Sequence, residues 1–361
     1  MDSRAVLAGR LATQRLSGPP AESPMQVVTE LVAVQAQDAP IAQAMIALRC
    51  ASSVADVRAA VAAGEIVRTH VLRPTWHYVA TQDLHRLLQL TSPKVESGMA
   101  SRHRQLDLDE NRLQEGLDAL AARLGGRHFA ARDEVGNALV DAGTLTRADA
   151  RFGQQVGHVL LVGELRGLVC SAPLAAAEHH YALAAEVLPP PEPFGREEAM
   201  TDLVGRFVAH HGPVALADLQ RWAKVSLAEA RAAVDRLQGR LERLEVDGVE
   251  LWHSPASALA ETRPRRAWLL SVFDEAFLSY RQVGWERSPG NPDAPNERRF
   301  AQSGGGPVLC DGRDVGGWKR RWDHGRPRIE WSLDPSLSRP AGRAVAEAAD
   351  RLLAVIEADA R

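Results

Sequence analysis

The feature that most constrains this chain is a repeated order of elements, in which helices are followed by a short β-ribbon. The first instance has three apolar helical segments and two β-rich runs, at residues 27–34, 41–50, 54–63, 66–72 and 75–80. The same order returns from residue 112, with a hairpin-like turn expected between Val162 and Leu168, and again from residue 197. The third ribbon turns at Asp247-Gly248, a dipeptide typical of tight hairpins. Helices followed by a two-stranded ribbon describe a winged helix.

Length and composition agree with a chain of several helical modules. Its 361 residues exceed one typical domain, and aromatics make up only 5% of them, so Ala, Leu and Val must fill the cores, which favours helices. Beyond residue 265 the pattern changes to a polar loop at 287–296, short β-runs with a turn at Asp311–Asp314, and a closing helix at 343–358. We predict a mainly α fold with small β wings (α+β): three tandem winged-helix motifs and a small C-terminal β-rich module, together C-shaped. The expected domains are 1–108, 109–192, 193–258 and 259–361.

Charge is distributed unevenly along the chain. The net charge of −3 gives no general attraction to nucleic acid, yet the run from 313 to 328 has six cations against two acids, a local net of +4. Its cations are Arg313, Lys319, Arg320, Arg321, Arg326 and Arg328. This density is typical of phosphate binding, and a hairpin there, with Trp318 and Trp322, could enter a minor groove. A solvated edge strand with protective charges is an equal alternative.

Several classes of protein are not indicated. The cysteines Cys50, Cys170 and Cys310 have no ligand or disulfide spacing, and the adjacent histidine pairs lack the spacing of a helical metal site. Phosphate-binding and serine-hydrolase motifs are missing. The N-terminus does not resemble a signal peptide, and no apolar run reaches membrane-spanning length. We therefore expect a cytoplasmic, nucleoid-associated protein without metal, cofactor or membrane partner.

The first candidate site is the glutamine pair Gln35 and Gln37, at the end of an apolar helix just before Pro40. Backbone opening ahead of a proline would let both amides project to one side. A carboxamide can hold a water molecule through its carbonyl and donate hydrogen bonds to a sugar or base. The alternative is that both glutamines only satisfy loose backbone groups at a turn or cap.

In order and spacing, five segments of the chain resemble the AlkZ family of bacterial DNA glycosylases. They are Gln35-Ala36-Gln37-Asp38-Ala39-Pro40 and residues 72–79, 211–222, 273–281 and 311–320. The resemblance spans nearly the whole chain. It implies tandem winged helices, removal of N7-alkylguanine and unhooking of interstrand cross-links of the azinomycin type. In the family, two glutamines separated by one residue form the catalytic motif, and a sister branch has aspartate at the second position.

The resemblance implies that Gln35 and Gln37 are catalytic. An N7-alkylguanine is a cationic leaving group, so the enzyme has only to place a water at C1′ and stabilise an oxocarbenium-like sugar. Lysine occurs only at 94, 224 and 319, which together with the family favours a monofunctional enzyme. We expect a monomer that binds double-stranded DNA carrying alkylated purines, at an open concave surface that suits lesions too bulky to flip into a closed pocket. A non-catalytic DNA-binding regulator and a protein-interaction module are the alternatives.

Two further segments enter the expected site. In the first wing, Arg73 and His77 are expected to contact DNA, whereas Trp76 is expected to fill the core. The neighbours Asp274 and Glu275 are expected to shape the site or to cap the following helix. The expected DNA-binding residues are therefore Arg73, His77, Arg313, Lys319, Arg320 and Arg321.

Overall fold

The computed structural model describes residues 3–173, 179–255, 267–291, 304–324 and 326–357. The chain divides into two compact units. Unit 1 comprises residues 1–58, 200–222 and 226–361, and unit 2 comprises residues 59–199 and 223–225. No helix in the described ranges is both long enough and apolar enough to cross a membrane.

Unit 2 is mainly helical, with one β-hairpin and one small three-stranded sheet. Its elements are β2 (Ile66–His70), β3 (Trp76–Ala80), the 3-10 turn η1 (Thr81–Asp83), α5 (Leu84–Gln105), α6 (Glu110–Leu124), β4 (Ala130–Ala131), α7 (Arg132–Asp141), α8 (Phe152–Leu165), β5 (Val169–Ser171), β6 (His180–Leu183) and α9 (Ala184–Val187). Strands β2 and β3 form one antiparallel hairpin, and β6 pairs with both β4 and β5. Helix α4 (Val54–Ala62) spans the division between the units.

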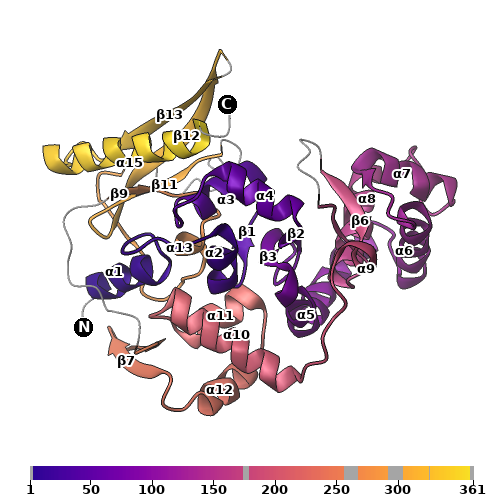
Figure 1. Ribbon diagram of the computed structural model, residues 1–361, viewed down its shortest axis with the longest axis horizontal. Helices are drawn as coiled ribbons and strands as arrows, with labels where there is room; N and C mark the ends of the chain where they lie inside the picture. The colour runs from indigo at the N-terminus through magenta and orange to yellow at the C-terminus, as the bar shows by residue number, and fades with distance from the viewer. Residues whose placement is uncertain (1–2, 174–178, 256–266, 292–303, 325, 358–361) are drawn as a thin grey trace. The chain divides into compact units, whose positions relative to one another are not determined.

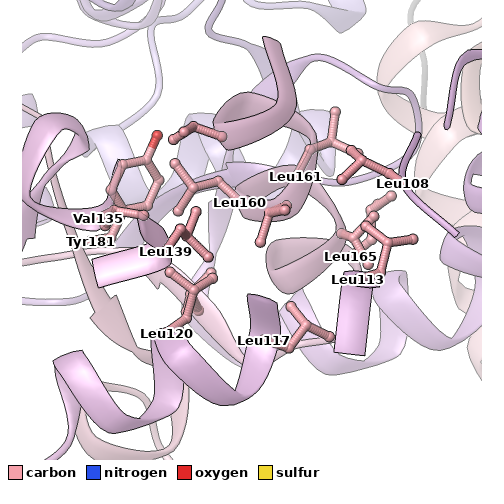
Figure 2. Packing of buried hydrophobic residues seen from close by; sticks show 14 of the residues in the cluster. Leu108, Leu113, Leu117, Leu120, Val135, Leu139, Leu160, Leu161, Leu165 and Tyr181 are labelled. Carbon is pink, nitrogen blue, oxygen red and sulfur yellow. The ribbon is translucent and has the colours of Figure 1, made fainter. Parts of the chain in front are cut away.

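The core of unit 2 is built from leucines. Figure 2 shows side chains from α6, α7 and α8 packed into one cluster, with Tyr181 of β6 among them. Helix α6 contributes Leu113, Leu117 and Leu120, spaced so that they share one face of the helix. Close packing also requires Gly116, because a Cβ there would come within 2.9 Å of Val159.

Unit 1 assembles segments from both ends of the chain. Its helical elements are α1 (Ser3–Thr13), α2 (Pro24–Leu31), α3 (Ala39–Ala47), most of α10 (Arg196–His211), α11 (Leu216–Ala223), α12 (Leu227–Arg236) and α13 (Glu275–Leu278). Strand β1 (Val34–Gln35) lies between α2 and α3. Strands β7 (Glu242–Val246) and β8 (Val249–His253) form a hairpin that turns at Asp247 and Gly248, both with positive φ.

The C-terminal part of unit 1 is a sheet with one covering helix. Strands β9 (Ala267–Leu269), β10 (Glu286–Arg287), β11 (Gly306–Cys310), β12 (Arg313–Asp323) and β13 (Arg326–Leu333) form it, in the order β10-β12-β11-β9, with β13 also paired to β12. Helix α15 (Arg339–Glu357) packs against this sheet, and the β12–β13 hairpin extends past the other strands (Figure 1).

Most of the predicted elements are present, with three corrections. The apolar helix predicted for 27–34 ends at Leu31, because Val32 has φ +67° and the chain then becomes extended. The turn predicted between Val162 and Leu168 is wrong, because α8 continues to Leu165 and β5 pairs with β6. The 22-residue helix α5 was not predicted, and Pro93 lies inside it. The number of winged helices and the four domain boundaries stay predictions, and part of the predicted polar loop 287–296 lies outside the described residues.

Candidate functional site

The glutamine pair lies in an extended turn between β1 and α3, not at a helix end as predicted. Gln35 ends β1 and is 7% exposed, whereas Gln37 is exposed. Helix α3 begins two residues later, where the Asp38 carboxylate accepts the Ile41 N–H at 3.2 Å and Pro40 occupies the first turn. The turn thus leads from a buried glutamine to a surface glutamine within three residues.

Buried acidic residues hold this turn in place. The Gln35 backbone N–H donates to Glu275 Oε1 at 2.9 Å. At the other end of α3, Arg49 donates to both oxygens of Asp274, at 2.7 and 2.9 Å. Asp274 also caps α13 by accepting the Ala276 N–H at 2.8 Å, so the predicted capping role is confirmed for this residue. Glu275 thus anchors the backbone at the start of the turn, and the Arg49–Asp274 pair anchors the chain at the far end of α3.

The cations of the β12–β13 hairpin lie on its exposed half. From Lys319 onward β12 pairs only with β13. Lys319 and Arg320 are half-buried, whereas Arg321 and Trp322 nearer the tip are exposed. Glu330 forms ion pairs with Lys319 and Arg321, at 3.2 and 3.5 Å. Exposed pairs of this kind contribute at most about 1 kcal/mol, so a phosphate can displace the carboxylate.

The buried middle of strand β12 separates the first cation of the predicted basic run from the later ones. Arg313 begins β12, pairs with Glu286, and is separated from the ribbon by a buried stretch that includes Trp318. Trp318 is 1% exposed and donates to Leu270 O, so it belongs to the core, whereas Trp322 is 59% exposed. The structure therefore places Lys319 and Arg321 on one face of the ribbon and Arg320 on the other face beside Trp322, and it leaves Arg313 apart from all three.

Arg320 also approaches the turn that holds the glutamines. A Cβ added to Gly304 would lie 3.2 Å from Asp38 Oδ2 and 3.3 Å from Arg320 Nη2, so both side chains border the same point. Gly304 has φ +61°, a conformation that favours glycine, and a Cβ there would require the two side chains to move slightly. The base of the basic ribbon therefore adjoins Asp38, the residue after Gln37. Sequence patterns gave no sign of this proximity.

The residues predicted in the first wing have different surroundings. His77 is fully buried, and burial together with the neighbouring Arg73 guanidinium holds the pKa of its imidazole well below the usual range. Direct contact of His77 with DNA is therefore incompatible with this structure. Arg73 is partly exposed and donates to His77 Nε2 at 2.9 Å, so its position depends on the histidine. Trp76 is only partly buried and lies over Arg68, 4.1 Å from the guanidinium carbon to the ring centroid.

Metal ligands do not converge anywhere in the described ranges, where no group of three or more His, Cys, Asp or Glu side chains could hold an ion. Sequence patterns did not reveal that Glu275 and Asp274 bind to the segment that carries the glutamine pair. Their hydrogen bonds join segments more than 200 residues apart.

Comparison with known proteins places these features in context. A family model described as DNA glycosylase AlkZ-like matches residues 28–355. An interstrand DNA cross-link repair glycosylase from Streptomyces sahachiroi is 26% identical over 336 residues, which cover 88% of this chain and 87% of that protein. The solved structure of the DNA glycosylase AlkZ from the same organism superposes with a TM-score of 0.73 at 22% identity, covering 99% of this chain and 97% of the other.

Proposed function

Because the chain belongs to the AlkZ-like DNA glycosylase family, we propose that it hydrolyses the N-glycosidic bond of N7-alkylguanine in double-stranded DNA, in bulky mono-adducts and in interstrand cross-links. The observation that carries the proposal is the pairing of a solvent-exposed Gln37 with a buried Gln35 whose backbone is anchored by Glu275. A surface amide on a fixed backbone suits a lesion that remains attached to the opposite strand. The Streptomyces relative, named for cross-link repair, supports the same substrate class.

In the proposed reaction the Gln37 carbonyl accepts a hydrogen bond from the attacking water, and Gln35 either shares that water or holds the deoxyribose. The water oxygen bonds to C1′ while the C1′–N9 bond breaks, and its electron pair neutralises the positive charge of the alkylated guanine. The water loses a proton to solvent. The products are free N7-alkylguanine and an abasic site. Because the leaving group is already cationic, orientation and electrostatic stabilisation suffice and a strong acid is unnecessary.

Excision assays test the function directly. We expect release of 7-methylguanine from methylated duplex DNA, and separation of the strands of a duplex cross-linked through guanine N7. Borohydride should trap no covalent DNA adduct, since water and not a lysine is the nucleophile. Release of 7-methylguanine with cross-links left intact would limit the function to mono-adducts, and no release of either product would contradict the proposal.

For DNA binding we propose Arg73 and the cations of the hairpin, chiefly Lys319, Arg320 and Arg321. Replacing Arg320 and Arg321 by Glu should weaken binding to duplex DNA, and the slope of log affinity against log salt should fall by about 0.9 for each phosphate that the protein no longer neutralises. Affinity measured at several salt concentrations checks both effects. Arg243→Glu is the matched control, because Arg243 is an exposed arginine of β7, outside this hairpin. If the double variant keeps both affinity and slope, the hairpin is only a solvated edge.

A further inference from the structure

Glu275 occupies an unusual position for an acidic residue. It is the first residue of α13 and is 1% exposed. Oε1 accepts the Gln35 N–H at 2.9 Å, while Oε2 accepts the Trp222 indole N–H at 2.6 Å and the Ser279 hydroxyl at 3.0 Å. Donors therefore approach both oxygens of the carboxylate, which links the backbone of the glutamine turn to α11 and to the end of α13.

These three donors require a side chain whose two terminal atoms both accept hydrogen bonds. A carboxylate does so, whereas a carboxamide of the same size has one accepting oxygen and one donating NH₂. In Glu275→Gln the NH₂ group must face either Gln35 N–H or Trp222 Nε1–H, and both are donors. The Gln35 side of the network then shifts whenever the shorter hydrogen bond to Trp222 is kept.

From this geometry, and resting on the proposed function, we propose that Glu275 is a positioning residue for DNA glycosylase chemistry, acting on the two glutamines through the backbone of Gln35. Glu275 contacts neither substrate nor water in this role. Its effect is to hold the start of the Gln35-Ala36-Gln37 turn, while Asp274 and Arg49 hold the far end of α3. A shift of the turn by about 1 Å would misplace the attacking water and cost on the order of 10²-fold in rate.

The test compares single-turnover excision of 7-methylguanine by the full chain. Glu275→Gln should lower the excision rate by about 10-fold or more while affinity for the lesion-bearing duplex is unchanged. The matched control is Asp218→Asn, because Asp218 is also a buried carboxylate, one that accepts the backbone N–H groups of Ala215, Arg281 and Gln282. Asp218→Asn should lose about as much stability as Glu275→Gln but should excise 7-methylguanine at the normal rate.

A second substitution that restores the excision rate of Glu275→Gln distinguishes a positioning role of Glu275 from a general loss of stability. In Glu275→Gln/Trp222→Phe the indole donor is gone, so the amide can turn its oxygen to Gln35 N–H and its NH₂ towards Ser279, and the excision rate should recover in part. If Glu275→Gln does not fold, Glu275→Asp is used. Its shorter carboxylate cannot reach both sides and should lower the rate at unchanged affinity.

Three outcomes would overturn the inference: a normal rate in whichever Glu275 variant folds, equal losses of rate in the Glu275 and Asp218 variants, or no recovery in the double variant. Gln37→Ala distinguishes this failure from failure of the proposed function. If Gln37→Ala is inactive and Glu275→Gln excises at the normal rate, only the positioning role of Glu275 is wrong. If Gln37→Ala itself excises at the normal rate, the proposed catalytic site is wrong.

Discussion

Gln37→Ala should abolish release of 7-methylguanine from methylated DNA and leave the protein folded. Loss of a single preorganised polar group aimed at the reacting atoms costs on the order of 10²–10³-fold in rate. Because Gln37 is exposed, its truncation leaves no cavity in the core. Single-turnover excision measures the effect, and the thermal unfolding midpoint verifies the fold.

The matched control for this experiment is Gln114→Ala, which truncates an exposed glutamine of α6 outside the motif. It should excise at the normal rate. An undiminished rate in Gln37→Ala would contradict the assignment of the glutamine pair, since the proposed reaction depends on the Gln37 carbonyl to hold the water.

Asp274→Ala should destabilise the protein by about 3–5 kcal/mol, because it leaves the Arg49 guanidinium buried without its carboxylate. Arg49 and Asp274 have side chains 2% and 1% exposed, and they are joined by two hydrogen bonds. Asp274→Ala also removes the N-cap of α13. Urea unfolding monitored by circular dichroism measures the loss of stability.

Two comparisons sharpen the stability experiment. The exposed ion pair between Arg243 and Glu250 provides a control, and Glu250→Ala should cost at most about 1 kcal/mol. The double variant Arg49→Met/Asp274→Ala should cost less than the sum of the two single variants, because neither charge is then left unpaired. A destabilisation as small in Asp274→Ala as in Glu250→Ala would show that the buried pair contributes no more than a surface pair.

The hairpins were predictable from sequence because their turns are set by local stereochemistry. Asp247-Gly248 and Asp311-Gly312 supply two consecutive residues that tolerate positive φ, and the structure has φ values of 52° and 75° in the first turn and 51° and 77° in the second. The register of β7 and β8 follows from their turn, whereas that of β11 and β12 shifts between Val308 and Leu309. These two turn signals identify the β7–β8 and β11–β12 hairpins. The basic β12–β13 hairpin turns after Asp323, and its sequence signal was the density of cations.

The conformation at the glutamine pair was not predictable in the same way. Helix α2 ends because Val32 adopts φ +67°, which is unfavourable for a β-branched residue and is imposed by packing, not by local preference. Helix α5 continues through Pro93, where the usual rule for helix ends fails. Spacing drew attention to Gln35 and Gln37 but predicted the wrong backbone around them.

The other features that sequence patterns did not predict depend on interactions between residues far apart in the chain. Whether His77 faces DNA or the interior depends on how a whole unit packs, and its alternating strand pattern allowed either. Glu275 lies 240 residues from Gln35, so no local pattern connects them. Only the folded chain shows that one acidic residue supports the turn and its neighbour supports the following helix.

Unit 1 is assembled from segments of the chain that the ribosome synthesises at different times. Residues 59–199 of unit 2 separate the first segment of unit 1 from the other two, which are divided only by residues 223–225. Chains emerge from the ribosome with the N-terminus first. Residues 59–199 can pack while translation continues, but the glutamine turn made early in synthesis must wait for residues 274 and 275. With the proposed role of Glu275, a chain that terminates before residue 274 would carry the glutamine pair without its support and would lack excision activity.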